Sequence, residues 1–215
     1  MPDLQKLYDA ILNGDNKAAA SITKEALAQA VEPMDLVNKY MIPAMDEVGR
    51  RFESEDCFVP ELLLSARAMK GSLELIRPLL AARGTEPAGR VAIGTVQGDL
   101  HDICKNLVAS MLEGGGFEVV DLGADVSPEK FIAAIQSRRI DVVALSALLT
   151  VTMPTMKTTI EALTLAGVRQ KVKVIVGGAP VTKEYAKQIG ADGFAENAIS
   201  AVSLVRKMLA EQPVA

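Results

Sequence analysis

The only histidine of the chain lies two residues after an aspartate, a spacing that suits metal chemistry. Asp99 and His101 belong to the polar segment 97–102, which follows an apolar run. A neutral imidazole can bind a metal through one ring nitrogen while its other N–H donates to a carboxylate, and Asp99 is close enough to be that acceptor. An isolated D-x-H is more often a surface histidine beside a helix-capping aspartate. This segment alone therefore leaves both interpretations open.

Two further segments carry residues that could contact a ligand. Hydroxyl side chains, which both donate and accept hydrogen bonds, occur at Ser146, Thr150 and Thr152. The paired glycines Gly177 and Gly178 would let the backbone approach something flat or bulky. Taken singly, the threonines are also typical helix caps, and the glycines fit a plain strand-to-helix turn. Their shared position after apolar runs makes these segments a candidate site.

The elements that must position these residues form an alternation of strands and helices. Short runs rich in β-branched residues, each followed by a segment of helical length, cover 91–96, 117–121, 142–145 and 172–176, and a weaker run covers 193–195. Apolar strands separated by crossover helices predict a parallel sheet covered on both faces. We therefore expect a five-stranded, doubly wound α/β domain, Rossmann-like or flavodoxin-like, with the three segments at the carboxyl ends of its strands.

The residues before this region follow a different pattern. From Asp3 to about Arg83 the apolar residues recur at helical spacing, and Pro33 and Pro60 each stand where a new helix would begin. This pattern predicts a bundle of four helices. The segment 84–89 is rich in residues that break helices and poor in apolar ones, as a connector would be. We therefore expect a helical cap domain over 1–86 and an α/β domain over 87–215.

Composition excludes several classes of function. The chain has 215 residues, of which 49% are hydrophobic, and a net charge of −4 with scattered basic residues, so a nucleic-acid partner is not expected. No segment has the ~18 uncharged apolar residues that a membrane span needs, and the first residues lack the pattern of a signal peptide. Two cysteines without a C-x-x-C pair fit a reducing cytoplasm.

A nicotinamide dinucleotide enzyme is the main alternative from another class. Asp121 ends the second expected strand roughly where Rossmann domains place a ribose-binding acid. However, the segment 94–99 lacks the G-x-G-x-x-G spacing, and Asp99 would repel a pyrophosphate at the following helix. We therefore do not favour this class.

Together the three segments resemble those of cobalamin-binding corrinoid proteins. The family pattern is D-x-H-x-x-G, then S-x-L, then G-G, each after a parallel strand. Here it is matched by Asp99 and His101 followed by Cys104, and by the segments 146–148 and 177–178. Phe52 and the segment 58–66 look like the helical cap of methionine synthase and of the methanol, methylamine and O-demethylase corrinoid proteins. The resemblance therefore covers nearly the whole chain.

The resemblance implies a role for each matched residue. His101 would be the lower axial ligand of cobalt, and Asp99 and Thr152 would complete a relay that takes up a proton as that bond breaks. Ser146 and Thr150 would flank the buried nucleotide base of the cofactor. The wider set of cofactor-binding residues would be Gly98, Asp99, Leu100, His101, Asp102, Cys104, Ser146, Leu148, Thr150, Gly177, Gly178, Phe58 and Leu63.

Two of these assignments carry particular expectations. Cys104 replaces the glycine of the family motif and would project where the nucleotide loop passes; we expect a small buried side chain rather than a metal ligand. Gly177 and Gly178 would leave room for the nucleotide tail. Phe58, Leu63 and Met69 could shield a cobalt-bound methyl group, although ordinary packing of an amphipathic helix also explains them. The cap would then have to swing away, bending at the connector.

The resemblance also implies a function. The protein would carry a methyl group on the cobalt of cobalamin or a related corrinoid, as a subunit that is not catalytic alone. A substrate-specific methyltransferase would methylate it from methanol, a methylamine, glycine betaine or an aryl methyl ether. A folate- or thiol-dependent methyltransferase would remove the methyl group, and a reductive activase would be a further partner. Sensing or storage of cobalamin without methyl transfer is the alternative.

Overall fold

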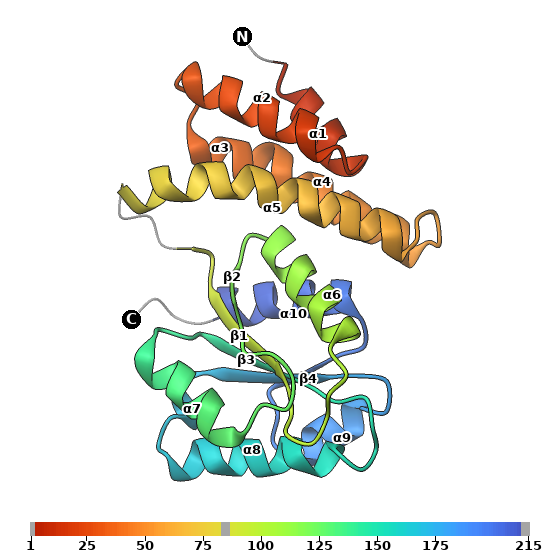
Figure 1. Ribbon diagram of the computed structural model, residues 1–215, viewed down its shortest axis with the longest axis vertical. Coiled ribbons are helices and arrows are strands. Elements are labelled where there is room, and N and C mark those ends of the chain that lie inside the picture. Colours follow the sequence, from red (N-terminus) through yellow and green to blue (C-terminus); the bar gives the residue numbers. More distant parts are fainter. Residues whose placement is uncertain (1–2, 83–86, 212–215) are drawn as a thin grey trace. The chain divides into compact units, whose positions relative to one another are not determined.

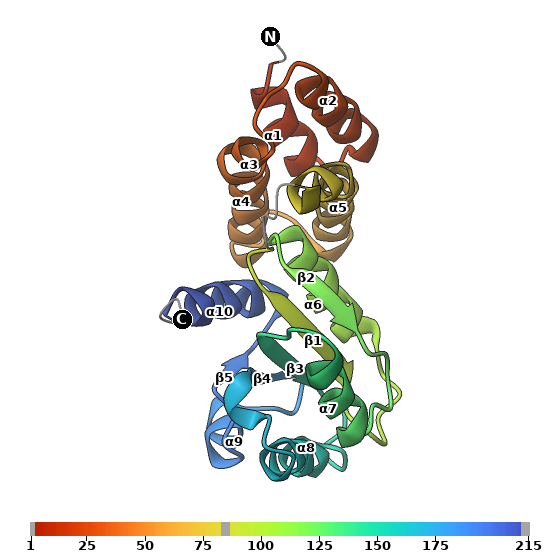
Figure 2. The ribbon, with the colours of Figure 1, turned by 90° about the vertical axis from the view of Figure 1, so that its left-hand side faces the viewer.

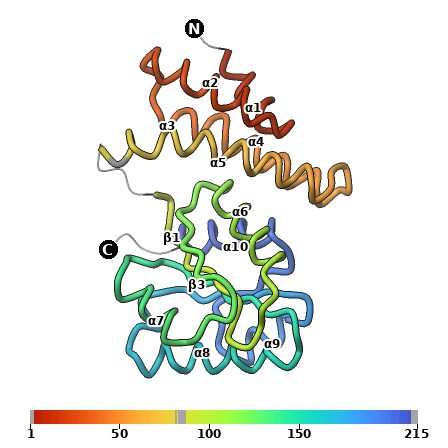
Figure 3. Tube along the Cα trace, in the orientation of Figure 1, coloured from red at the N-terminus to blue at the C-terminus, as the bar shows by residue number. Residues whose placement is uncertain are grey.

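The computed structural model describes residues 3–82 and 87–211, and they form two compact units. The first unit comprises the residues up to Ala88, and the second comprises most of the chain from Gly89 onward. Figure 3 traces the chain through both. Part of the expected hinge, residues 84–86, lies outside the described residues. No helix in the described ranges is long and apolar enough to cross a membrane.

The first unit consists of four helical segments, as the apolar spacing predicted. Its elements are α1 Gln5–Leu12, α2 Asn16–Ala28, the continuous series α3 Pro33–Leu36, η1 Val37–Met41 and α4 Ile42–Glu53, and α5 Val59–Ala82 (Figure 1). Asp15 caps α2 by accepting a hydrogen bond from the Ala18 N–H. In the third segment η1 is a π-helical turn, in which the Ile42 N–H donates to the Val37 carbonyl. Pro43 follows and has no N–H to continue the ladder.

The second unit is a five-stranded parallel sheet between two layers of helices. The strands are β1 Arg90–Thr95, β2 Glu118–Asp121, β3 Val142–Ser146, β4 Lys173–Gly177 and β5 Gly193–Ala195. Their order in the sheet is β2-β1-β3-β4-β5. Helices α6 Ile103–Gly114 and α10 Ala198–Ala210 cover one face, and α7 Pro128–Ser137, α8 Met153–Leu165 and α9 Lys183–Gln188 cover the other (Figures 1 and 2). The predicted doubly wound fold is therefore confirmed.

The strand order creates a switch point between β1 and β3. These neighbours pair in parallel, and Thr95, Ser146 and Gly177 lie in one row across β1, β3 and β4. The chain leaves β1 toward α6 and β3 toward α8, which lie on opposite faces of the sheet (Figure 2). In open α/β sheets the crevice between two such diverging loops is the usual ligand site. All three candidate segments therefore begin at the same edge.

Candidate functional site

Asp99 and His101 lie in the loop that follows β1, and their side chains are in direct contact. The His101 ring nitrogen Nδ1 is 2.7 Å from Oδ1 of Asp99, and the His101 backbone N–H donates to the same oxygen at 3.1 Å. The Thr95 hydroxyl donates to the His101 carbonyl at 2.8 Å. The backbone and the ring of the histidine are thus both fixed, as the D-x-H spacing suggested for a metal-binding imidazole.

The other carboxylate oxygen of Asp99 joins this loop to the loop after β3. Oδ2 accepts hydrogen bonds from the backbone N–H groups of Leu148, at 2.8 Å, and Leu149, at 3.2 Å. It also accepts one from the Thr152 hydroxyl at 2.8 Å. Thr152 occupies the N-cap position of α8, but its hydroxyl makes no capping bond to the helix. The capping alternative for Thr152 is therefore wrong, and the contact with Asp99 is present.

The surroundings of Asp99 determine its charge. Burial alone would raise the pKa of this carboxyl, but the hydrogen bonds from the Leu148 N–H, from His101 and from Thr152 outweigh it and hold the pKa well below its usual range. The carboxylate stays ionised and can only accept, so Nδ1 of His101 must be the donor. The lone pair of Nε2 is then available to a ligand, and the His101 side chain is 51% exposed.

Large apolar side chains are exposed next to His101 in sequence and in the segment after β3. Leu100 in the loop after β1, Ile103 at the start of α6 and Val151 in the loop after β3 are each more than three quarters exposed. Only Leu100 was among the residues expected from the sequence. Ile103 and Val151 were missed because single apolar residues at the start of a helix usually pack inward. Large apolar side chains left in water are what a broad apolar ligand would cover.

The hydroxyl and glycine segments lie at the same edge of the sheet. Ser146 ends β3 beside Gly177, which ends β4. Within the described chain the Ser146 and Thr150 hydroxyls have no protein hydrogen-bond partner. Thr150 is exposed and Ser146 is partly exposed, so both hydroxyls could bind a ligand.

The neighbouring backbone gives a further reason for the two glycines. A Cβ on Gly178 would overlap the carbonyl oxygen of Ala147, and one on Gly177 would lie 2.8 Å from the carbonyl oxygen of Ala195. Gly178 also has φ +127°, a conformation that other residues rarely adopt. The neighbouring backbone excludes side chains here, before any ligand is considered.

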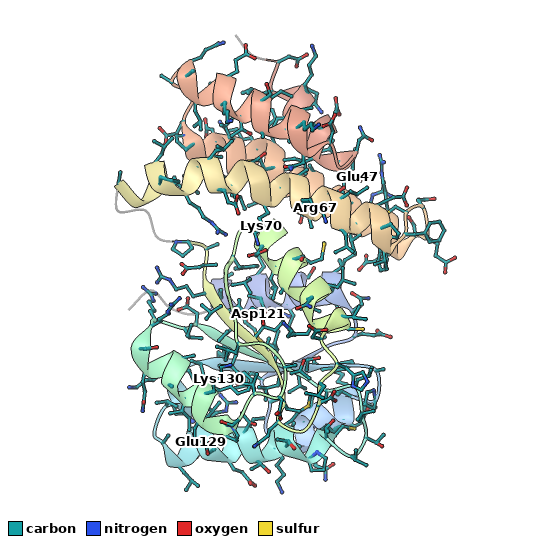
Figure 4. The ribbon with its side chains drawn as sticks, viewed as in Figure 1. Glu47, Arg67, Lys70, Asp121, Glu129 and Lys130 are labelled. Atoms are coloured by element: carbon teal, nitrogen blue, oxygen red, sulfur yellow. The ribbon has the colours of Figure 1, made fainter. Side chains whose placement is uncertain are left out.

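In the first turn of α6, the burial predicted for Cys104 is wrong, and the contact made by Lys105 was not predicted. Cys104 is exposed, not buried as expected, because the next residue turns inward in its place. Lys105 is buried and its ammonium group lies 2.6 Å from both carboxylate oxygens of Asp121. Asp121, labelled in Figure 4, lies at the end of β2. Asp121, considered for a ribose, is thus engaged by a lysine. Asp102 and Gly98 are exposed in the loop itself.

The candidate cap residues lie in the helical unit. Phe58, just before α5, is two-thirds exposed, and Leu63 on α5 is 38% exposed. Large apolar side chains at such positions remain available for contact with a ligand or partner. Met69 is buried, which favours the alternative of ordinary helix packing for that residue.

Comparison with known families identifies the chain. Family models described as B12 binding domains match residues 3–77 and residues 89–203, and together they take in most of the sequence. The chain belongs to the B12-binding corrinoid proteins. Its cofactor is therefore cobalamin or a related corrinoid, as the three segments indicated.

Several relatives of this corrinoid protein are similar along their whole length. A trimethylamine corrinoid protein from Methanosarcina acetivorans is 43% identical over 96% of both chains. A dimethylamine corrinoid protein from Methanosarcina barkeri is 40% identical over 96% of this chain and 97% of its own. A corrinoid protein from Desulfitobacterium hafniense is 38% identical with the same coverage.

Solved structures agree with this membership. A cobalamin-binding protein from Desulfitobacterium hafniense has a TM-score of 0.79 at 32% identity, covering 96% of this chain and 98% of its own. A methanol:cobalamin methyltransferase complex from Methanosarcina barkeri contains a chain with a TM-score of 0.85 at 28% identity, covering 98% of this chain and 81% of that one. Both likenesses span the helical and the α/β units of this corrinoid protein.

The donor set of the corrinoid protein suits such a cofactor. Among the described residues there is no group of three or more His, Cys, Asp or Glu side chains that could hold a metal ion. A bare ion would find too few ligands at His101, because protein metal sites usually need three or four. A corrinoid supplies the equatorial ligands of its own cobalt, so a single imidazole is enough.

Proposed function

We propose that this chain carries a methyl group on corrinoid cobalt between two partner methyltransferases. The observation that carries the proposal is the free Nε2 of the exposed His101 ring, fixed from behind by the buried Asp99 carboxylate. When bound, the corrinoid supplies a cobalt ion that can accept and release a methyl group. The protein then needs to hold that group and present it to its partners.

His101 is proposed as the axial ligand, bound through Nε2. Asp99 orients the ring and fixes the tautomer with its proton on Nδ1. Thr152 supports the carboxylate on its far side. Because Asp99 remains ionised, the imidazole of His101, rather than the carboxyl, would hold a proton taken up at this site. The relay of the resembling proteins would therefore work here through the histidine.

The remaining residues would bind the body of the cofactor. Leu100, Ile103 and Val151 are exposed apolar residues that the macrocycle would cover. The free hydroxyls of Ser146 and Thr150 would bind polar atoms of the nucleotide tail. The same site would be lined by Gly98, Asp102, Cys104 and Leu148. The loop that contains Gly177 and Gly178 would line it as well.

We retain 1–86 as the proposed cap domain and 87–215 as the proposed cofactor domain. Phe58 and Leu63 would cover the reactive face of the cofactor from the cap. Their exposure supports this role, because side chains committed to a helical core would be buried. The substitution Phe58→Ala should then speed the loss of the methyl group to solvent without changing the axial ligand.

A methylamine is the proposed donor, and the donor-specific methyltransferase is the first proposed partner. The similarity to trimethylamine and dimethylamine corrinoid proteins supports this choice over methanol, glycine betaine or aryl ethers. A folate- or thiol-dependent methyltransferase is proposed as the acceptor partner, and a reductive activase as the third. Each should recognise the loaded protein.

The test begins with binding of hydroxocobalamin to the apoprotein, followed by visible absorption. We expect stoichiometric binding and a spectrum in which histidine has replaced the nucleotide base, and His101→Ala should lose that spectrum. Glu129→Gln, on the exposed surface of α7, is a control that should behave as the wild type. Binding without any effect of His101→Ala would overturn the assignment of the ligand.

The second stage adds purified methyltransferases specific for trimethylamine, dimethylamine, monomethylamine and methanol. Methylation of the loaded protein by one of the methylamine enzymes, with its substrate, would establish carrier function and the donor. Methylation only by the methanol enzyme would overturn the choice of donor. Tight binding of cofactor with no transfer from or to any partner would instead favour sensing or storage.

A further inference from the structure

The loop between β2 and α7 continues to pair with β1 after β2 has ended. The Leu122 N–H donates to the Ile93 carbonyl at 2.8 Å, and the Thr95 N–H donates to the Gly123 carbonyl at 3.0 Å. The Val126 N–H donates to the Thr95 carbonyl at 2.9 Å. These bonds run along the segment that leads from β1 to the candidate site.

Asp125 makes the last two contacts of this series, and they reach the D-x-H segment itself. Its backbone N–H donates to the Asp99 carbonyl at 3.0 Å. Its side-chain Oδ1 accepts from the Gly98 N–H at 2.7 Å. One residue therefore holds the peptide groups at Gly98 and Asp99 through both its backbone and its side chain.

The backbone conformation of Asp125 supports a specific role. Its φ is +52°, in the left-handed region that residues other than glycine seldom adopt and that Asp and Asn tolerate best. Such a conformation persists where surrounding bonds compensate for it, and it is concentrated at functional sites. Glycine would adopt it freely but has no side-chain acceptor, so an aspartate at this position points to a need for Oδ1.

We propose that Asp125 is a positioning residue for His101. It holds the peptide groups at Gly98 and Asp99, so the Asp99 carboxylate stays where it can accept from Nδ1 of the ring. Without Oδ1, the Gly98 N–H loses its partner and the loop can shift. The role matters for the cofactor only if His101 is the axial ligand, so this inference rests on the proposed function.

The first experiment uses the apoprotein, in which the single histidine gives one imidazole signal set. Nitrogen NMR of the ring at a pH of about 9, above the ordinary pKa of histidine, reports which nitrogen carries the proton. We expect the Nδ1-protonated tautomer to dominate in the wild type. Asp125→Gly keeps the positive φ but removes the acceptor, and it should lower the ratio of Nδ1-H to Nε2-H by about fivefold, the effect of one lost hydrogen bond.

Two variants separate positioning from general stability. Asp125→Asn keeps both an acceptor oxygen and tolerance of positive φ, and should retain the wild-type ratio. Asp141→Ala removes a comparable carboxylate contact, from Asp141 Oδ2 to the Arg90 N–H, at the start of β1 rather than its end. It should lower stability and leave the tautomer unchanged. An unchanged ratio in Asp125→Gly, or an equal change in Asp141→Ala, would overturn the proposal.

A second experiment distinguishes this inference from the proposed function. Hydroxocobalamin affinity is measured for Asp125→Gly, for His101→Ala and for the double variant. We expect Asp125→Gly to weaken binding by about fivefold alone and to add nothing in the His101→Ala background. No effect of His101→Ala on affinity or spectrum would refute the proposed ligand. An effect of His101→Ala together with a full, additive effect of Asp125→Gly would refute only the positioning role.

Discussion

Lys105 and Asp121 form an ion pair whose two partners differ greatly in exposure. The lysine side chain is 1% exposed and the aspartate side chain is 43% exposed, although the ammonium group contacts both carboxylate oxygens. Asp121 also accepts a hydrogen bond from the Gly123 N–H at 2.8 Å. The pair joins the first turn of α6 to the end of β2.

This difference predicts unequal effects of removing the two charges. Asp121→Asn leaves a buried ammonium group without its counter-charge and should lower the free energy of unfolding by about 3 kcal/mol. Lys105→Met leaves a carboxylate that water can reach, and should cost about 1 kcal/mol or less. Urea denaturation of the apoprotein measures both values. Equal losses of unfolding free energy in the two variants would mean that the exposure of each partner does not determine the cost of removing its charge.

Removing the Thr152 hydroxyl should leave the Asp99 carboxylate less firmly positioned. Thr152→Val keeps the shape of the side chain but loses the 2.8 Å bond to Oδ2, so we expect hydroxocobalamin affinity to fall by about fivefold. Thr152→Ser keeps the hydroxyl and should remain within about twofold of the wild type. Spectroscopic titration measures the affinities. A serine variant as weak as the valine variant would assign the effect to packing of the methyl group.

Gly178→Ala should destabilise the protein even without cofactor. The substitution combines a positive φ with overlap on the Ala147 carbonyl oxygen, so the loss should exceed about 1 kcal/mol. Gly190→Ala is a matched control, because Gly190 has φ +77° and nothing within 4 Å of its added Cβ. Thermal unfolding of the two apoproteins should show the larger loss at Gly178. A similar loss of stability in both variants would mean that the positive φ alone, without the overlap on Ala147, causes it.

Glu47 on α4 should contribute to stability only above acid pH (Figure 4). Hydrogen bonds from Arg50 and then Arg51 lower the pKa of this carboxyl from 4.5 to about 2. A lowered folded-state pKa gives stability that is present above the unfolded value and is lost as pH falls from about 4.5 toward about 2. Denaturation of wild type and Glu47→Gln across that range should show the difference between them shrinking. A constant difference would contradict the assignment.

Much of the fold could be predicted because its signals are local. The short apolar runs, four of them rich in β-branched residues, predicted all five strands to within about one residue at each end, and Pro33 marked the start of α3. Asp99 and His101 could be proposed as site residues because they match a family motif, and the structure places Thr152 in contact with Asp99. These residues come together because the parallel strands that precede them end at the same edge of the sheet.

The errors and omissions come from contacts between distant residues. Cysteine is usually buried and lysine exposed, yet Cys104 faces water while Lys105 turns inward to meet Asp121, sixteen residues away in sequence. Nothing near Asp125 in the sequence indicates that it reaches back to Gly98. The need for glycine at 178 comes from the carbonyl of Ala147, in the loop after β3. Residue type and periodicity carry no information on such pairings.

The several bonds of the Asp99 carboxylate bear on how this family can diverge. His101 accounts for two of its five donors, and the other three belong to the loop after β3. A descendant that abandoned the metal could replace the exposed histidine at little cost to its fold. Loss of the aspartate would leave three hydrogen-bond donors of the loop after β3 without this acceptor at once. In lineages that have lost the cofactor, the histidine should therefore be substituted long before the aspartate, and the remaining aspartate would mark their origin in this family.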